Sequence, residues 1–245
     1  MGFLSEIYVN TYMHVKQHKI GLFTVFTGDI CNLACTVCNH TFSTRWKREL
    51  GISNTSRNKP DEFDYSVFSN AKKVVIGGGE PLLNKQTFKI MENSPPTAEI
   101  YVHFNGTVLP SDRFMKLCSK FDNISFAFSI DDIGEQFEYL RYPAKWDSVS
   151  SNILHLREIC QDNITFEFNI TICQLNKESH TRVIEWISQN IPCNRYGIKT
   201  EYYTQDANSN LDNEAYIAYL DRLDSVRGLS WRDVFQVGDI PITLV

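Results

Sequence analysis

The sequence predicts an α/β protein built on a partial (β/α)6 barrel of the TIM type, with parallel strands and a short C-terminal extension. Three observations support this fold class. Apolar strand-like runs alternate with amphipathic stretches, six such units follow one another, and most of the runs end in polar or glycine-rich sequence. This alternation is typical of βαβ units, and six right-handed units in a row curl into part of a barrel.

Each expected strand is a short run rich in β-branched and aromatic residues, and turn-forming residues follow several of these runs. The six runs are Leu22–Thr27, Lys73–Ile76, Glu99–Phe104, Ile124–Ile130, Ile164–Ile172 and Gly197–Tyr203. In parallel sheets of this kind, ligands bind outside the carboxyl ends of the strands. The polar ends of these runs are therefore where a functional site is expected.

The segments between the runs show helical spacing of apolar residues. The expected helices are Phe42–Leu50, Lys85–Glu92, Ser111–Phe121, Trp146–Cys160, Ser179–Gln189 and Asp212–Val226. We expect residues 22–205 to form the barrel, residues 1–21 an N-terminal extension, and residues 206–245 the short C-terminal extension. No pattern assigns elements to residues 227–245.

Composition narrows the class of protein further. The chain has 245 residues, of which 42% are hydrophobic and 22% are charged, and a net charge of −5, so wholesale disorder is excluded. No apolar run approaches the roughly 18 residues of a membrane helix, and Met1–Asn10 lacks the pattern of a signal peptide. We therefore expect a cytoplasmic protein without a membrane partner. The mild acidity gives no indication of nucleic-acid binding.

Three of the seven cysteines, Cys31, Cys35 and Cys38, follow the first expected strand within eight positions. In a reducing compartment, thiols so close together are more typical of ligands than of disulfides. Such a loop can wrap an iron–sulfur cluster or another soft metal. Zinc stays open as an alternative from this segment alone, with His40 as a fourth ligand.

The second expected strand ends in the sequence IGGGEPL, Ile76–Leu82. Glycines at a strand end allow the backbone to approach a ligand closely. In a parallel sheet this segment lies beside the cysteine loop, at the same edge. The position of the glycines next to the thiols is therefore more informative than either feature alone.

Together, CNLACTVC and GGGEPL resemble the radical S-adenosylmethionine (radical SAM) enzymes, over residues 20 to about 205. The CxxxCxxC spacing of that family is matched by Cys31, Cys35 and Cys38, and its GGEP motif by Gly78, Gly79, Glu80 and Pro81. The resemblance implies that the three thiolates hold a 4Fe–4S cluster with one iron open to SAM. It also implies that reductive cleavage of SAM gives a 5′-deoxyadenosyl radical that abstracts hydrogen from a substrate C–H bond.

Further positions match elements of the family. Ser129 and Asp131 resemble a Ser-Ile-Asp element that faces the cofactor, and Arg141 resembles an arginine that pairs with the SAM carboxylate. Asn105 resembles a Thr-Asn-Gly element, and Asn169 is a candidate for a ribose hydrogen bond. Three of these residues also have a structural alternative: Asn105 can shape a turn, Asp131 can cap a helix and Arg141 can form a surface ion pair.

The sequence departs from the family at Val37, where an aromatic residue often packs near the adenine. Residues around FSIDDIGEQFEYLRYPAKWDSV also resemble phage and marine radical SAM proteins with a "twitch" extension, which usually holds a further cluster. The other four cysteines are Cys118, Cys160, Cys173 and Cys193. Their scattered spacing favours buried small side chains over ligands of a second cluster.

The resemblance implies an electron donor such as flavodoxin or ferredoxin, and a substrate that is a peptide or a nucleoside or modified base. A glycyl-radical activating enzyme and a non-catalytic zinc-loop module are the alternatives. Tyr101, His103, Lys199, Glu201 and Tyr203 alternate along two expected strands. Alternation does not decide whether these side chains face the inside of the barrel.

Overall fold

The computed structural model describes residues 21–53, 63–173, 175–177, 179–191, 196–202, 213–228 and 230–235. Its centre is one sheet of six parallel strands in the order β1-β2-β3-β4-β5-β6. The strands are β1 Leu22–Phe26, β2 Lys73–Gly77, β3 Glu99–Phe104, β4 Ile124–Ser129, β5 Ile164–Ile172 and β6 Tyr196–Tyr202. The partial (β/α)6 barrel is confirmed, because every strand pairs in parallel with the next one along the chain. Most of residues 1–21, together with Cys193 and Tyr203, lie outside the described residues.

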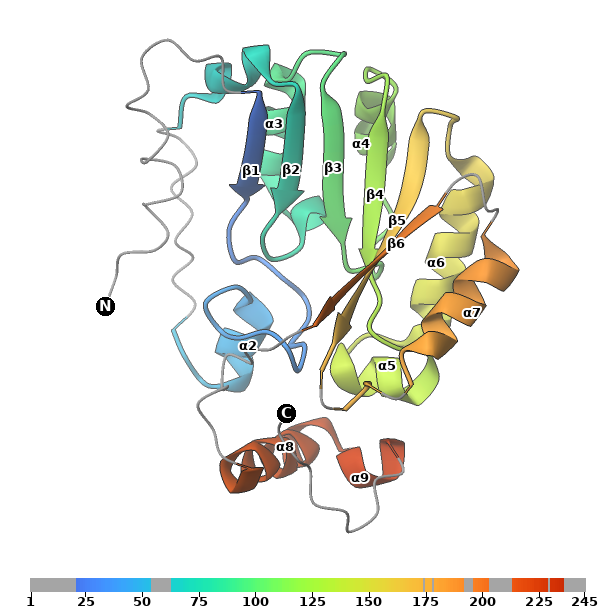
Figure 1. The fold of residues 1–245 in the computed structure, drawn as a ribbon. Helices are drawn as coiled ribbons and strands as arrows, with labels where there is room; N and C mark the ends of the chain where they lie inside the picture. Colours follow the sequence, from blue (N-terminus) through green and yellow to red (C-terminus); the bar gives the residue numbers. More distant parts are fainter. Residues whose placement is uncertain are drawn as a thin grey trace.

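Helices cover one face of this sheet and its carboxyl end (Figure 1). They are α2 Thr44–Glu49, α3 Lys85–Asn93, α4 Asp112–Cys118, α5 Gly134–Leu140, α6 Trp146–Ile159, α7 Thr181–Asn190, α8 Asn213–Arg227 and α9 Trp231–Val234, with 3-10 helices η2 Tyr65–Asn70 and η3 Pro81–Leu83. In Figure 1 the arrowheads of β1 to β5 point toward α2 and α5, and α8 and α9 lie beyond them. The carboxyl ends of these strands are therefore the enclosed end of the molecule.

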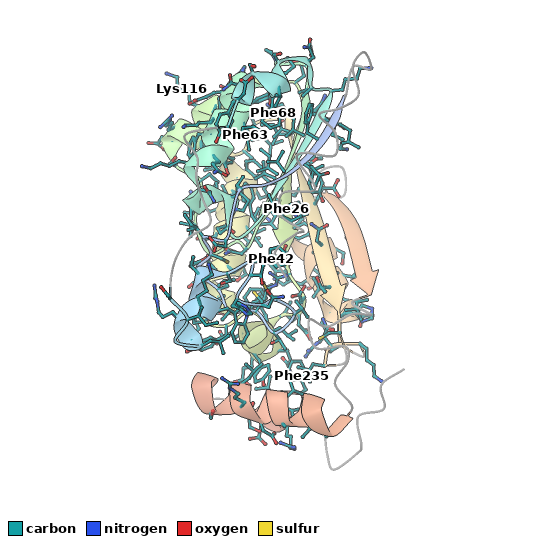
Figure 2. All side chains as sticks on the ribbon, turned by 90° about the vertical axis from the view of Figure 1, so that its left-hand side faces the viewer. Phe26, Phe42, Phe63, Phe68, Lys116 and Phe235 are labelled. Atoms are coloured by element: carbon teal, nitrogen blue, oxygen red, sulfur yellow. The ribbon has the colours of Figure 1, made fainter. Side chains whose placement is uncertain are left out.

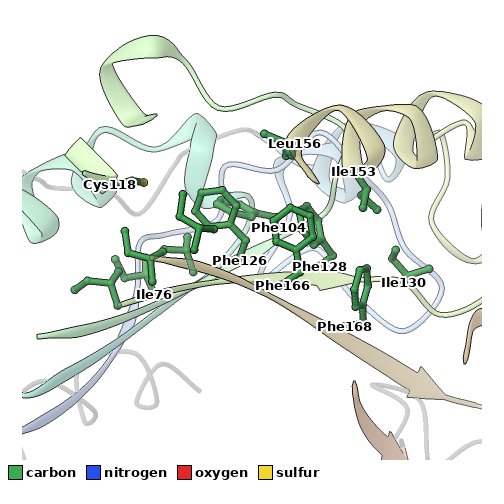
Figure 3. Packing of buried hydrophobic residues seen from close by; sticks show 14 of the residues in the cluster. Ile76, Phe104, Cys118, Phe126, Phe128, Ile130, Ile153, Leu156, Phe166 and Phe168 are labelled. Carbon is green, nitrogen blue, oxygen red and sulfur yellow. The ribbon is translucent and has the colours of Figure 1, made fainter. Parts of the chain in front are cut away.

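The main core lies between the sheet and the helices on its covered face. Residues at every second position of β5, from Ile164 to Ile172, are buried, and the residues between them are at least partly exposed. The phenylalanines of neighbouring strands pack against one another beneath α6, as Figure 3 shows for Phe104, Phe126, Phe128, Phe166 and Phe168. This period of two shows that helices cover only one face of the sheet.

The opposite face of the sheet carries the strand residues that alternate with the core residues, and several of them are polar. Val102 belongs to the helix-side core, so Tyr101 and His103 point the other way, into the concave face. Asn169 lies on that face of β5, and its Cα is paired with that of Lys199 in β6. The question that the sequence left open for Tyr101 and His103 is thereby answered.

Two short α-helices of the described residues, α5 and α9, were missed by the sequence prediction. Helix α5 begins after Ile133 with no side-chain cap, and its first residue is Gly134 with φ +59°. Neither feature is a signal for a helix start. Helix α9 lies in the C-terminal extension, where no element was expected, although Ser230 caps it through its side chain.

No helix in the described part of the chain is long and apolar enough to cross a membrane.

Candidate active site at the carboxyl end of the sheet

The cysteine loop follows β1 and is held by hydrogen bonds from Ser43 and Trp46, at the start of α2. The Ser43 hydroxyl donates to the Leu33 carbonyl at 2.5 Å, and the Trp46 indole N–H donates to the Cys35 carbonyl at 2.9 Å. Ser43 is also the N-cap of α2, because its hydroxyl accepts the Trp46 N–H. The start of α2 therefore fixes the path of the loop around Cys35.

The three thiols share one small region of this loop. Cys35 is buried, Cys31 and Cys38 are partly exposed, and none of them forms a disulfide. Burial raises the pKa of Cys31 and of Cys38 to about 12, and the neighbouring cysteine thiols add to both shifts. The thiols of Cys31 and Cys38 thus interact electrostatically with the neighbouring cysteines. Each of the three cysteines must lose a proton when it binds a metal.

Within the described ranges, no three His, Cys, Asp or Glu side chains are grouped as ligands of a single metal ion. His40, the fourth ligand of the zinc alternative, is exposed. A 4Fe–4S cluster spaces its cysteine sulfurs farther apart than one zinc ion does. The donor set of three thiols on one partly buried loop fits such a cluster by its chemistry.

The glycines after β2 lie directly against the segment that leads into the cysteine loop. The Gly79 N–H donates to the Gly28 carbonyl at 2.7 Å, and the Glu80 N–H donates to the Ile30 carbonyl at 2.7 Å. A Cβ at residue 79 would lie 2.3 Å from the Ile30 carbonyl oxygen, and one at Gly78, where φ is +126°, would lie 2.9 Å from the Gly28 carbonyl oxygen. These glycines permit two backbones to meet, whereas the sequence suggested only an approach to a ligand.

Glu80 connects the glycine segment with the end of β3. Its carboxylate accepts the Asn105 N–H at 2.8 Å and the Leu82 N–H at 3.1 Å, and the side chain is 1% exposed. Burial raises the pKa of Glu80 to about 7, against the lowering effect of these two hydrogen bonds and of Arg141. Pro81, the next residue, is the first residue of η3 and is also buried.

Asn105 ties the end of β3 to the cysteine loop. Its side-chain N–H donates to Asn32 at 2.8 Å, and its side-chain oxygen accepts the Thr107 N–H at 2.9 Å. Asn32 in turn donates to the Thr107 hydroxyl at 2.8 Å. Asn105 therefore shapes a turn, as one alternative expected, and also contacts the loop between Cys31 and Cys35. Asn32 was missed because a single polar residue between cysteines gives no periodic signal.

Asp131 and Arg141 form a buried ion pair. The Arg141 Nε lies 2.8 Å from Asp131 Oδ2, and its Nη2 donates to Oδ1 at 3.0 Å. Asp131 Oδ1 also accepts the Thr171 N–H at 2.9 Å. Burial alone would lower the pKa of Arg141, but Asp131 and the nearby Cys35 outweigh burial and raise it. Asp131 does not cap a helix, and the pair is not at the surface, so neither structural alternative holds in its expected form.

Asn169 and Ser129 lie side by side on the concave face, at paired positions of β5 and β4. The Tyr101 hydroxyl donates to the Asn169 side-chain oxygen at 3.3 Å, and the Asn169 amide nitrogen lies 3.2 Å from His103 Nδ1. Tyr101 and His103 also contact each other edge to face. The structure thus places Asn169 in a polar network of the concave face that the sequence did not reveal.

A second apolar cluster closes the outer side of the cysteine loop. Cys173, Leu220, Leu223 and Trp231 are buried there together with Ala34 and Trp46, and Val37 and Cys38 pack against them. Helices α8 and α9 supply much of this cluster, and Phe235, labelled in Figure 2, contacts the Tyr139 ring at 5.7 Å. Cys173 is therefore a packing residue in the structure, as its isolated position in the sequence suggested.

No model of a known protein family matches the chain. Among curated proteins, it is similar to the 7-carboxy-7-deazaguanine synthase of Clostridium acetobutylicum, with 27% identity over 96 residues. That match covers 38% of this chain and 41% of the synthase. The chain thus matches less than half the length of this curated relative.

Solved structures resemble the chain over a longer span. SuiB of Streptococcus suis bound to S-adenosylmethionine matches with a TM-score of 0.58 and 15% identity, over 88% of this chain and 48% of SuiB. The anSMEcpe protein with bound AdoMet matches with a TM-score of 0.56 and 17% identity, over 85% of this chain and 62% of anSMEcpe. A second SuiB structure, bound to the precursor peptide SuiA, has a TM-score of 0.54 at 13% identity, over 88% and 46% of the two chains.

SuiB and anSMEcpe are radical SAM enzymes. The chain has the fold of that class, so the resemblance drawn from the cysteine and glycine motifs is confirmed at the level of the fold. The chain covers less than two thirds of each of these solved structures.

Proposed function

We propose that this protein is a radical SAM enzyme whose Cys31, Cys35 and Cys38 hold a 4Fe–4S cluster and whose neighbouring residues bind SAM. The observation that carries this proposal is the meeting of the CxxxCxxC loop and the GGGEP segment at the carboxyl end of a partial barrel. Backbone hydrogen bonds join the glycine segment to the residues that lead into the cysteine loop, although the paired residues Gly28 and Gly79 are 51 positions apart in the sequence. When bound, the cluster and SAM supply one-electron cleavage of SAM and hydrogen abstraction from a substrate C–H bond.

The chain's own residues then have distinct tasks. The hydrogen bonds of Ser43 and Trp46 hold the cysteine loop in place. The second apolar cluster, to which α8 and α9 contribute, excludes water from the outer side of the loop. Gly78–Pro81, Ser129 and Asn169 lie at or near the carboxyl ends of their strands, and we assign SAM binding to this edge. Asn105 and Glu80 support that edge through their hydrogen bonds.

We further propose a polar substrate that binds over the concave face, either a peptide or a nucleoside or modified base. Tyr101, His103 and Asn169 give that face its hydrogen-bonding groups. The peptide class is supported by SuiB, which was solved with its precursor peptide, and the base class by the similarity to the deazaguanine synthase. An electron donor such as flavodoxin or ferredoxin would reduce the cluster in a cytoplasmic setting.

The experiment is anaerobic reconstitution with iron and sulfide, followed by electron paramagnetic resonance of the reduced protein with and without SAM. The parent protein should bind about four irons per chain, as a 4Fe–4S cluster requires, and SAM should change its spectrum. Cys31→Ala and Cys38→Ala should lose the cluster, whereas Cys160→Ala, which removes a thiol outside the loop, should keep it. A colourless parent that binds one zinc ion per chain would favour the zinc-loop alternative instead.

The substrate class is tested separately by incubating the loaded enzyme with deuterated peptides and nucleosides. Deuterium transfer into 5′-deoxyadenosine from one class, and none from the other, identifies the substrate. Transfer from the glycine of a partner protein would favour the glycyl-radical activating alternative.

A further inference from the structure

Arg141 lies directly across from the central cysteine of the loop. The Ala34 N–H donates to the Tyr142 carbonyl at 2.7 Å, and the Thr36 N–H donates to the Leu140 carbonyl at 2.8 Å. The two segments therefore run antiparallel, and the residues between these bonds, Cys35 and Arg141, face each other. Both are among the buried residues of the molecule.

The guanidinium is also fixed in direction. Asp131 accepts a hydrogen bond from Arg141 Nη2 at 3.0 Å, its second oxygen lies 2.8 Å from Arg141 Nε as an ion-pair contact, and Asp131 is itself held by the Thr171 N–H. One hydrogen bond and one close ion-pair contact keep the guanidinium beside Asp131 and limit how far its charge can move. Arg141 therefore cannot move its charge away from the loop without breaking a buried ion pair.

The charge of Arg141 lies beside the cysteine loop and is shielded from solvent. The Arg141 side chain is 9% exposed, and Cys35, the residue paired opposite Arg141, is 9% exposed as well. Charges in a buried region act on one another more strongly than charges at the surface do.

We propose that Arg141, oriented by Asp131, is a positioning residue for the iron–sulfur cluster. The fixed positive charge of its guanidinium favours the reduced state of the cluster. This inference rests on the proposed function but goes beyond it, because the effect requires no SAM. A cation held beside the thiolates stabilises the extra electron of the reduced cluster, so it raises the reduction potential. Any contact of Arg141 with the SAM carboxylate would be a separate role.

The test is the midpoint potential of the reconstituted cluster, measured spectroscopically without SAM. Arg141→Gln should shift the potential to a more negative value, while Arg141→Lys, which keeps the charge, should stay close to the parent. The control is Arg45→Gln in α2, which removes a cation whose partner is Glu49 rather than Asp131. It should leave the potential unchanged.

Because Arg141→Gln leaves Asp131 buried without its partner, that variant can lose stability. The double variant Asp131→Asn/Arg141→Gln removes both charges and avoids this problem, and we expect its potential to be more negative as well. If the glutamine variants bind iron as the parent does and keep its potential, the inference is wrong and the proposed function stands. If the parent itself forms no cluster, the proposed function fails.

Discussion

At the scale of single residues, the site depends on backbone contacts that side-chain chemistry alone does not reveal. The motif residues were found from the sequence because the cysteine spacing after one strand and the glycine segment after the next form a specific combination, although neither motif is specific alone. Their supporting partners were not, since Asn32, Ser43 and Trp46 are ordinary residues without periodic signal. The pairing of Asp131 with Arg141 likewise depends on how the end of β4 lies against the end of α5. The local sequence between the two residues does not reveal this arrangement.

The close approach at Gly79 gives a direct prediction. Gly79→Ala should lower the free energy of unfolding by ~3 kcal/mol, because its Cβ would lie 2.3 Å from the Ile30 carbonyl oxygen and neither backbone can move freely. Urea unfolding of the apo-protein measures the effect. Gly51→Ala is the control, since nothing lies within 4 Å of its Cβ and only its φ of +64° is unfavourable. Equal losses for the two variants would contradict the close approach.

The raised pKa of Glu80 predicts that the free energy of unfolding depends on pH. Burial raises its pKa to about 7 in the folded protein, from an ordinary value of 4.5. Because the folded state holds this proton more tightly than the unfolded state does, the stabilisation from Glu80 is complete below pH 4.5 and is lost as the pH rises through about 7. The loss is about 3 kcal/mol for a shift of this size.

The measurement compares the parent with Glu80→Gln in urea at pH 5 and pH 7.5. The variant is expected to be less stable at both values, since an amide nitrogen would face one backbone N–H. Its loss between the two pH values should be clearly smaller than that of the parent. A pH dependence equal to that of the parent would show that Glu80 does not titrate in this range.

At the scale of elements, the strands were predicted within one or two residues because their apolar alternation is strong. Helix ends were less accurate, as for α4, which was expected over Ser111–Phe121 and ends at Cys118. Helix α5 was missed, although it supplies Tyr139 and leads into Arg141. The role of α8 and α9 was also beyond sequence reasoning, because it is defined by contacts with a loop almost 200 residues earlier.

The docking of α8 predicts a measurable interaction. The Tyr139 hydroxyl donates to the Asp224 carboxylate at 2.9 Å, and the Tyr139 side chain is fully buried. Tyr139→Phe should lower the free energy of unfolding by ~1.5–3 kcal/mol, as expected for a hydrogen bond to a charged group. A double-mutant cycle with Asp224→Asn isolates this contact, and strictly additive losses would show that the hydrogen bond contributes nothing.

At the scale of the whole molecule, one face of the sheet provides stability and the other face and the strand ends provide the site. The fold class followed from the sequence because six repeated units leave few topologies. Which face is concave did not follow, since alternation labels two faces without saying which one the helices cover. The structure answers this through the phenylalanines that pack beneath α6 (Figure 3).

This division predicts very different costs for two phenylalanine substitutions. Phe128→Ala, in the centre of the aromatic core, should lower the free energy of unfolding by ~3–5 kcal/mol, because its ring contacts Phe104, Phe166 and Phe168. Phe42→Ala removes a ring that is 48% exposed, and should cost about 1 kcal/mol or less. Thermal or urea unfolding distinguishes the two, and similar costs would contradict the assignment of the core.

The central claim, that Cys31, Cys35 and Cys38 support radical SAM chemistry, is tested most directly by one product measurement. The anaerobically reconstituted protein is mixed with SAM and dithionite, and 5′-deoxyadenosine is quantified for the parent, Cys35→Ala and Cys160→Ala. We expect the parent and Cys160→Ala to form 5′-deoxyadenosine at similar rates and Cys35→Ala to form none. Formation by Cys35→Ala at the rate of the parent, or none by an iron-loaded parent, would contradict the claim.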